Sequence, residues 1–183
     1  FTYSHVLAGW RQAGAEIIPF SPLADEAPPQ DCDAVWLPGG YPELHAGQIA
    51  SASRFIEGLR GLAQRAVAIH GECGGYMVLG EGLEDGDGHR HAMAGLLRVE
   101  TSFRKRKLHL GYRQAAIRAD CALGRAGVRL YGHEFHYATL LSDQGAPLLD
   151  CADGSGATIA AGSQSGSVTG SFFHVISALD AES

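Results

Sequence analysis

The residue best suited to chemistry is Cys73, which lies in the middle of the sequence GECGG at residues 71–75. A short apolar run, 66–70, precedes this segment, and an apolar helix is predicted from Tyr76 onward. A nucleophile on a strained strand-to-helix turn needs neighbours without side chains, because any Cβ there would clash. The pattern therefore predicts a nucleophilic thiol at Cys73, and we expect the start of the helix to lower the pKa of this thiol.

A second glycine turn could complete this site. The sequence LPGGYPE at residues 37–43 also follows a buried-strand candidate, 34–37. In a parallel sheet, both turns lie at the carboxyl ends of strands, where open α/β sheets bind their ligands. We expect the glycine pair 39–40 and the backbone N–H of Gly74 to offer hydrogen bonds to a developing oxyanion.

A thiol that attacks an amide needs a histidine to protonate the leaving nitrogen. The strongest of the nine histidines are His133 and His136 in GHEFHY and His174 in GSFFH, which ends an apolar run late in the chain. His133 and His136 are three residues apart on a predicted strand and face opposite sides, so we expect no metal site there.

None of the remaining cysteines, at positions 32, 121 and 151, has a glycine on each side. We therefore expect them to be small buried side chains. No pair of cysteines forms a CxxC motif and no secretion signal is visible, so we expect reduced thiols in a cytoplasmic protein. The net charge is −6, which argues against nucleic acid or an anionic membrane as the main partner. No apolar run approaches the length of a membrane span.

The elements that must position these residues follow an α/β pattern. Helices are predicted at 4–12, 43–65 and from residue 76, and buried strands at 15–20, 34–37 and 66–70. Further strands are predicted at 95–103, 107–118, 127–137, 157–162 and 167–176. We expect a mostly parallel sheet with an antiparallel or mixed edge, within a single domain that spans residues 1–183.

The motifs LPGGYPELHA, GECGGYMVLGE, LGYR, GHEFHY and SFFH occur in this order. Together they resemble the C-terminal glutamine amidotransferase domain of the cobyrinic and hydrogenobyrinic acid a,c-diamide synthases. The resemblance runs over nearly the whole chain and implies the flavodoxin-like, three-layer fold of class I, triad-type glutamine amidotransferases. It implies that Cys73 is the nucleophile, that His174 is the base, and that the backbones of Gly40 and Gly74 bind the oxyanion.

The resemblance also leaves one role open. Most members of the wider class carry His-x-Glu, in which the glutamate orients the histidine, whereas Ile176 stands at that position here. The cobalamin branch is similar in lacking this acid, which suggests a Cys–His dyad, and Glu134 is one candidate for the orienting group. His133, Glu134 and His136 are also candidates for binding glutamine, because GHEFHY matches a strand that holds this substrate in the wider class.

The function implied is hydrolysis of glutamine to supply ammonia for amidation of the a and c acetate side chains of a corrinoid. The chain begins at Phe1 without an initiator methionine, so we expect a piece of a longer protein that also holds an N-terminal synthetase domain. ATP and Mg²⁺ are expected in that domain, and no cofactor is expected here, where no P-loop motif occurs. A homodimer is a further possible partner.

Two other functions remain open: a stand-alone cysteine hydrolase or chaperone of a related single-domain superfamily, and a non-catalytic docking module. The basic run 104–107 is predicted to be the tip of a hairpin, facing the synthetase domain or its corrinoid.

Overall fold

The structure is a computed structural model that describes residues 2–152 and 156–178. Its helices are α1 (Ser4–Gln12), α2 (Ala46–Ser51), α3 (Ser53–Gln64) and α4 (Gly74–Leu79), with short 3₁₀ turns at Pro22–Ala24 and Pro42–Leu44. Its strands are β1 (Ala34–Leu37), β2 (Ala68–Glu72), β3 (Gly82–Glu84), β4 (Arg90–Ala92), β5 (Val99–Ser102), β6 (His109–Ile117), β7 (Arg129–His136), β8 (Thr139–Asp143), β9 (Ala146–Ala152), β10 (Thr158–Ser165), β11 (Val168–Ser171) and β12 (Phe173–Ala178).

Three parallel strands carry the two glycine turns. β2 lies between β1 and β11, and Leu37 at the end of β1 pairs with Gly71 of β2. Ser171 at the end of β11 pairs with Glu72 at the end of β2. All three strands therefore end at the same edge of the sheet, which places the residues that follow them side by side.

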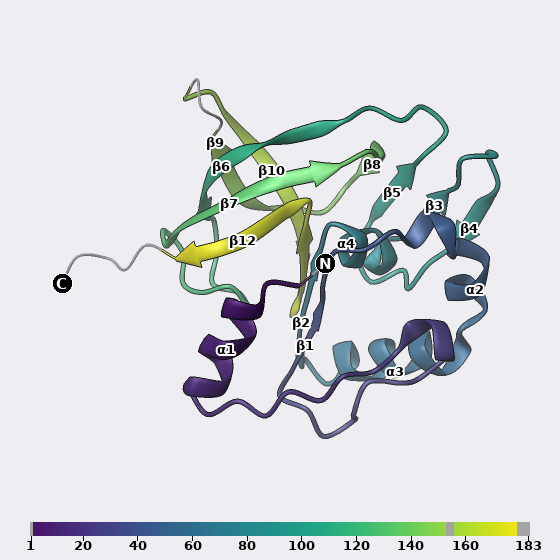
Figure 1. Ribbon diagram of the computed structural model, residues 1–183, viewed down its shortest axis with the longest axis horizontal. Coiled ribbons are helices and arrows are strands. Elements are labelled where there is room, and N and C mark those ends of the chain that lie inside the picture. The colour runs from purple at the N-terminus through teal and green to yellow at the C-terminus, as the bar shows by residue number, and fades with distance from the viewer. Residues whose placement is uncertain (1, 153–155, 179–183) are drawn as a thin grey trace.

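The rest of this eight-stranded sheet is antiparallel, in the order β11-β10-β9-β6-β7-β12. The expectation of a mostly parallel sheet was wrong in this respect, because the C-terminal half is built from strands joined without intervening helices. In Figure 1 these strands curl over the upper left of the molecule, and α1 and α3 lie below them. Only Phe172 separates β11 from β12, so the last strand of the sheet starts beside the parallel centre.

A smaller sheet has the order β4-β3-β5-β8. Because β5 and β6 belong to different sheets, the basic run 104–107 crosses from one sheet to the other and is not the predicted hairpin tip. Arg104 of this run pairs with Glu84 of β3.

Two buried apolar clusters hold these layers together. The larger contains Phe55 and Leu59 of α3 and Tyr76 of α4, whereas the smaller fills the curl of antiparallel strands and contains Phe173. Phe172 packs against the larger cluster. Two consecutive phenylalanines therefore pack into two different cores, which fixes the start of β12 just before His174.

The sequence predicted helix 4–12 and strand 34–37 with the bounds that the structure shows, and strand 66–70 overlaps β2. The predicted strand at 15–20 is absent, since Ile18 is 52% exposed there and Pro19 has no N–H to donate. The predicted helix at 43–65 is interrupted at Ala52, whose ψ of 76° is not helical, so α2 and α3 are separate helices.

A methyl group at Gly75 should be strongly destabilising, because a Cβ there would overlap the backbone carbonyl of Leu37. We expect Gly75→Ala to lower the free energy of unfolding by more than about 2 kcal/mol, since α4 would have to move away from β1. Gly9→Ala is the matched control: it adds the same group to α1 where no heavy atom lies within 4 Å, and it should stabilise by about 0.5–1 kcal/mol. Urea unfolding measures both, and equal effects would contradict the packing described here.

Candidate active site

Cys73 occupies a strained turn between β2 and α4. Its φ of 47° and ψ of −101° lie in a region that side chains other than glycine rarely adopt. The backbone N–H of Cys73 donates a hydrogen bond to the carbonyl of Ser171 at 2.8 Å, which anchors the turn to β11. The predicted strand–turn–helix around the thiol is therefore confirmed as a structural feature.

The second glycine turn lies directly against the first. A Cβ on Gly74 would come within 2.7 Å of the backbone nitrogen of Gly40, so only a glycine allows this approach. The backbone N–H of Gly75 donates to the carbonyl of Pro38 at 3.2 Å, which ties the two turns together. The backbones of Gly40 and Gly74 are thus brought to one place, as the sequence predicted.

A cavity of about 160 Å³ opens at this point. It is lined by Gly39, Gly40, Tyr41, Glu43, Cys73, Met77, Phe103, Phe135, His136, Tyr137 and His174. The predicted nucleophile and two of the three candidate histidines therefore share one cavity. His133 and Glu134 are not among the residues that line it.

The Cys73 thiol is buried and protonated. Burial raises its pKa to about 12, and the backbone N–H of Gly74 opposes this shift only in part. Glu43 and Glu72 raise it further through their negative charges. The sequence-based expectation of a lowered pKa was wrong, because α4 is short and the loss of hydration outweighs its effect. The thiol donates a hydrogen bond to the carbonyl of Phe135 at 3.5 Å.

His174 on β12 is contacted by side chains from two other strands. Its side chain, on β12, is only 3% exposed, and its Nδ1 lies 3.6 Å from Oε2 of Glu72 on β2. The imidazole stacks on that of His133 of β7, with ring centroids 4.9 Å apart and planes 16° apart. Glu72 was not expected from the sequence to have a role, although it stands directly before the nucleophile in GECGG.

His136 is held as a neutral imidazole. Its ring lies between Phe172, at a centroid distance of 3.8 Å, and His109, at 4.6 Å. Burial, assisted by His109, lowers the pKa of His136 to about 4. Its Nδ1 is 3.1 Å from the carbonyl of Ala138, which fixes Nδ1 as the protonated nitrogen because a carbonyl can only accept.

The other two candidates of the GHEFHY segment do not line the cavity and are held by other contacts. His133 bonds to the hydroxyl of Tyr3 on one side and stacks on His174 on the other. Glu134 forms an ion pair with Arg113 of β6 at 3.0 Å. These contacts give both side chains a structural explanation.

Glu43 is a further residue that the sequence analysis missed. Its Oε2 is buried and makes no hydrogen bond with the residues that the structure describes. Burial raises the pKa of Glu43, and Arg106 opposes the shift. A neighbouring hollow of about 270 Å³ is lined by Glu43 and Arg106 together with Phe103, Leu108 and Tyr137. A carboxylate and a guanidinium therefore stand together beside the cavity.

Comparisons with known proteins place this chain in a family. Residues 3–181 match the CobB/CobQ-like glutamine amidotransferase domain. The chain belongs to this family. It is 59% identical over 177 residues to hydrogenobyrinate a,c-diamide synthase of Rhodobacter capsulatus, and 58% identical over 178 residues to that of Mesorhizobium japonicum. Each match covers 96% of this chain and 40% of the relative.

The fold agrees with the family. A solved structure described as a glutamine amidotransferase superposes with a TM-score of 0.56 at 16% identity, covering 91% of this chain and 82% of the other. The fold class predicted from the sequence, α/β and like a class I glutamine amidotransferase, is confirmed. The family match also favours an amidotransferase over the single-domain hydrolase or chaperone.

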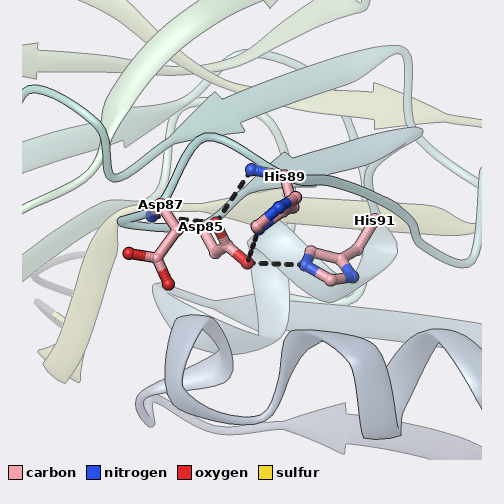
Figure 2. A network of polar contacts seen from close by, with 4 residues as sticks. All are labelled: Asp85, Asp87, His89 and His91. Atoms are coloured by element: carbon pink, nitrogen blue, oxygen red, sulfur yellow. Dashed lines mark hydrogen bonds and ion pairs between the residues drawn. The ribbon is translucent and has the colours of Figure 1, made fainter.

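A second polar cluster of this amidotransferase domain lies outside the cavity (Figure 2). Asp85 accepts hydrogen bonds from the backbone N–H groups of Asp87 and His89 and pairs with Nε2 of His91 at 2.8 Å. These bonds lower the pKa of Asp85 to about 2, with His91 the main cause. Asp85 therefore stabilises the turn between β3 and β4.

No helix among residues 2–152 and 156–178 is long and apolar enough to cross a membrane.

The raised pKa of Cys73 predicts how the resting enzyme reacts with iodoacetamide, which alkylates the thiolate. Because the thiol is protonated well above neutral pH, its alkylation rate should keep rising from about pH 7 to about pH 9. Mass spectrometry of the peptide that contains Cys73 measures this rate, with glutathione as the control thiol. A plateau below about pH 8 would show a thiolate and would contradict the protonated state.

Proposed function

We propose that this domain hydrolyses glutamine to glutamate and ammonia, with Cys73 as the nucleophile and His174 as the general base. The observation that carries the proposal is the shared cavity, which is lined by Cys73 on its strained turn, by Gly40 and by His174. Family membership supports the choice of glutamine as the substrate.

In the first half of the reaction, the Cys73 sulfur attacks the side-chain carboxamide carbon of glutamine. The thiol proton passes to His174 as the C–S bond forms, because the buried thiol holds its proton at neutral pH. The backbone N–H groups of Gly40 and Gly74 stabilise the tetrahedral oxyanion. Protonated His174 then gives its proton to the nitrogen, the C–N bond breaks, and ammonia leaves.

In the second half, water attacks the glutamyl thioester. His174 removes a proton from this water as the tetrahedral intermediate forms. When the intermediate collapses, the C–S bond breaks, His174 gives this proton to the Cys73 sulfur, and glutamate leaves. The thiol is thereby regenerated, so that one glutamine and one water give one glutamate and one ammonia.

The choice of base rests on the two histidines in the cavity. A pKa of about 4 makes His136 a weak base at neutral pH. His174 instead has a carboxylate beside its Nδ1, which stabilises the imidazolium that a base must become. His174 is therefore favoured for proton transfer, and His136 for shaping the cavity.

The chain spans about 40% of the length of the diamide synthases that it matches. We infer that the complete protein uses the ammonia to amidate the a and c side chains of hydrogenobyrinate, as its relatives are named for doing. The ATP- and Mg²⁺-dependent activation of those carboxylates then belongs to a synthetase part outside this chain. The basic run 104–107 near the cavity is suited to face that part or its polycarboxylate substrate.

Replacing the thiol should separate the two ammonia sources. In the full-length protein, Cys73→Ala should abolish glutamine-dependent amidation but leave amidation with added ammonium salt unchanged, because only the first needs the thioester. Product formation is followed by chromatography with each nitrogen source. Glutamine use at the wild-type rate would contradict the assignment of the nucleophile.

We further propose that Glu43 binds the α-ammonium group of glutamine and that Arg106 binds its α-carboxylate. The buried Oε2 of Glu43 has no hydrogen-bond partner among the described residues, and Glu43 and Arg106 line one hollow beside the cavity. The α-ammonium and α-carboxylate groups of glutamine are the complementary charges and lie on one carbon of the substrate. Each of the two protein charges would then compensate one charge of the zwitterion.

We expect Glu43→Gln to raise KM for glutamine by about 10-fold or more while kcat changes little, since a charge-assisted bond contributes about 1.5–3 kcal/mol. Steady-state glutaminase assays on the full-length protein measure both constants. Glu57→Gln on exposed α3 surface is the control and should behave as wild type. An unchanged KM in Glu43→Gln would exclude this role.

A further inference from the structure

Most class I glutamine amidotransferases carry a glutamate two residues after the catalytic histidine, and this chain lacks that acid. Ile176 stands at that position in β12 and cannot accept a proton or carry a charge. His174 nevertheless needs a partner, because a buried imidazole that accepts a proton becomes a buried cation. Glu134, the candidate from the sequence, is paired with Arg113.

Glu72 brings a carboxylate beside His174 from another strand of the sheet. Its side chain is 5% exposed, and its Oε2 lies 3.6 Å from Nδ1 of His174. Its other oxygen, Oε1, accepts a hydrogen bond from the backbone N–H of Val175 at 3.2 Å. One carboxylate thus reaches two consecutive residues of β12 from the end of β2.

We propose that Glu72 is the positioning residue of His174, which it orients and whose positive charge it stabilises during glutamine hydrolysis. This inference rests on the proposed function, in which His174 accepts the thiol proton. With Glu72 beside Nδ1, that nitrogen carries hydrogen and Nε2 becomes the atom that takes the proton from Cys73. The acid thus precedes the nucleophile in sequence and does not follow the histidine.

The 3.6 Å separation is longer than a normal N–H···O hydrogen bond. Such bonds are often loose in a free enzyme and tighten in the substrate complex. We expect this one to shorten when His174 becomes charged, because the attraction between ions then adds to the hydrogen bond.

The neighbouring groups leave the charge of Glu72 available for His174. Burial lowers the pKa of His70 on β2 to about 4, against the attraction of Glu72. Burial and His174 likewise lower the pKa of His133, so it also stays neutral at neutral pH. The hydroxyl of Tyr3, whose pKa is raised by burial and by Glu72, remains protonated and bonds to His133. His133 therefore supports the face of the His174 ring and Glu72 supports its edge.

The substitution Glu72→Gln separates charge from packing. Glutamine has nearly the same shape and can still accept the N–H of Val175 through its amide oxygen. Its amide nitrogen would face Nδ1 as a donor, which favours the tautomer with hydrogen on Nε2, where the Cys73 proton must arrive. An analogous acid-to-amide change in a catalytic triad costs about 10⁴ in kcat through this wrong tautomer.

The test uses the full-length protein with glutamine and, separately, with ammonium salt as nitrogen source. We expect Glu72→Gln to lower the kcat of glutaminase activity by about 100-fold or more, with KM for glutamine within about threefold of wild type. Ammonia-dependent amidation should be unchanged because it does not need this site, and the retained KM for glutamine shows that this domain is folded. Glu72→Asp keeps the negative charge but moves it away from His174, because its side chain is one methylene shorter. Its kcat should therefore lie between that of the wild type and that of Glu72→Gln.

The control is Glu84→Gln, which removes a partly buried carboxylate bonded to Ser102 away from the cavity and should leave kcat at the wild-type value. A Glu72→Gln kcat within about threefold of wild type would overturn the proposal. If this variant loses ammonia-dependent activity as well, Glu72→Asp decides, and wild-type kcat in a folded Asp variant would overturn it. Failure of the proposed function is seen separately, as glutamine use by Cys73→Ala.

Discussion

The positive φ at Cys73 is the constraint on which the rest of the site depends. A side chain in this conformation is strained, and the turn persists only because the surrounding backbone is fixed. Gly75 packs against the carbonyl of Leu37, and the N–H of Cys73 is bonded to Ser171. The same contacts bring the turn of Gly40 against Gly74. The geometry that exposes the sulfur to the cavity therefore also builds the oxyanion site that we propose.

Burial has a chemical consequence for this site. The pKa of about 12 means that the resting enzyme holds a neutral thiol, so the reaction depends on the base that removes its proton. The base must in turn be held close and be stabilised once charged. Phe172 and Phe173, which pack into two different cores, fix the backbone at His174, while Glu72 and His133 contact its ring. Packing and charge thus support the same imidazole.

Much of this arrangement could be predicted from the sequence, because glycines beside Cys73 and short apolar runs are local signals. The α/β fold class and β1 with its turn were predicted in this way. The antiparallel majority of the sheet was not, since pairing depends on contacts between distant strands. The pKa of Cys73 and the contact between Glu72 and His174 also depend on tertiary structure. Both arise only when strands that are far apart in the sequence pack together, so the local sequence does not predict them. The short apolar run at 15–20 was predicted to be a buried strand, and this prediction was wrong because Ile18 remains exposed.

The central claim is that Cys73, His174 and Glu72 form one relay around a glutamine-derived carbonyl carbon. A crystal structure of the full-length protein treated with a glutamine-directed chloroketone tests it most directly. The account predicts a covalent bond to the Cys73 sulfur, an inhibitor oxygen bonded to the N–H groups of Gly40 and Gly74, and His174 in hydrogen-bond contact with Glu72. Attachment at another residue, or His174 turned away from both Cys73 and Glu72, would contradict it.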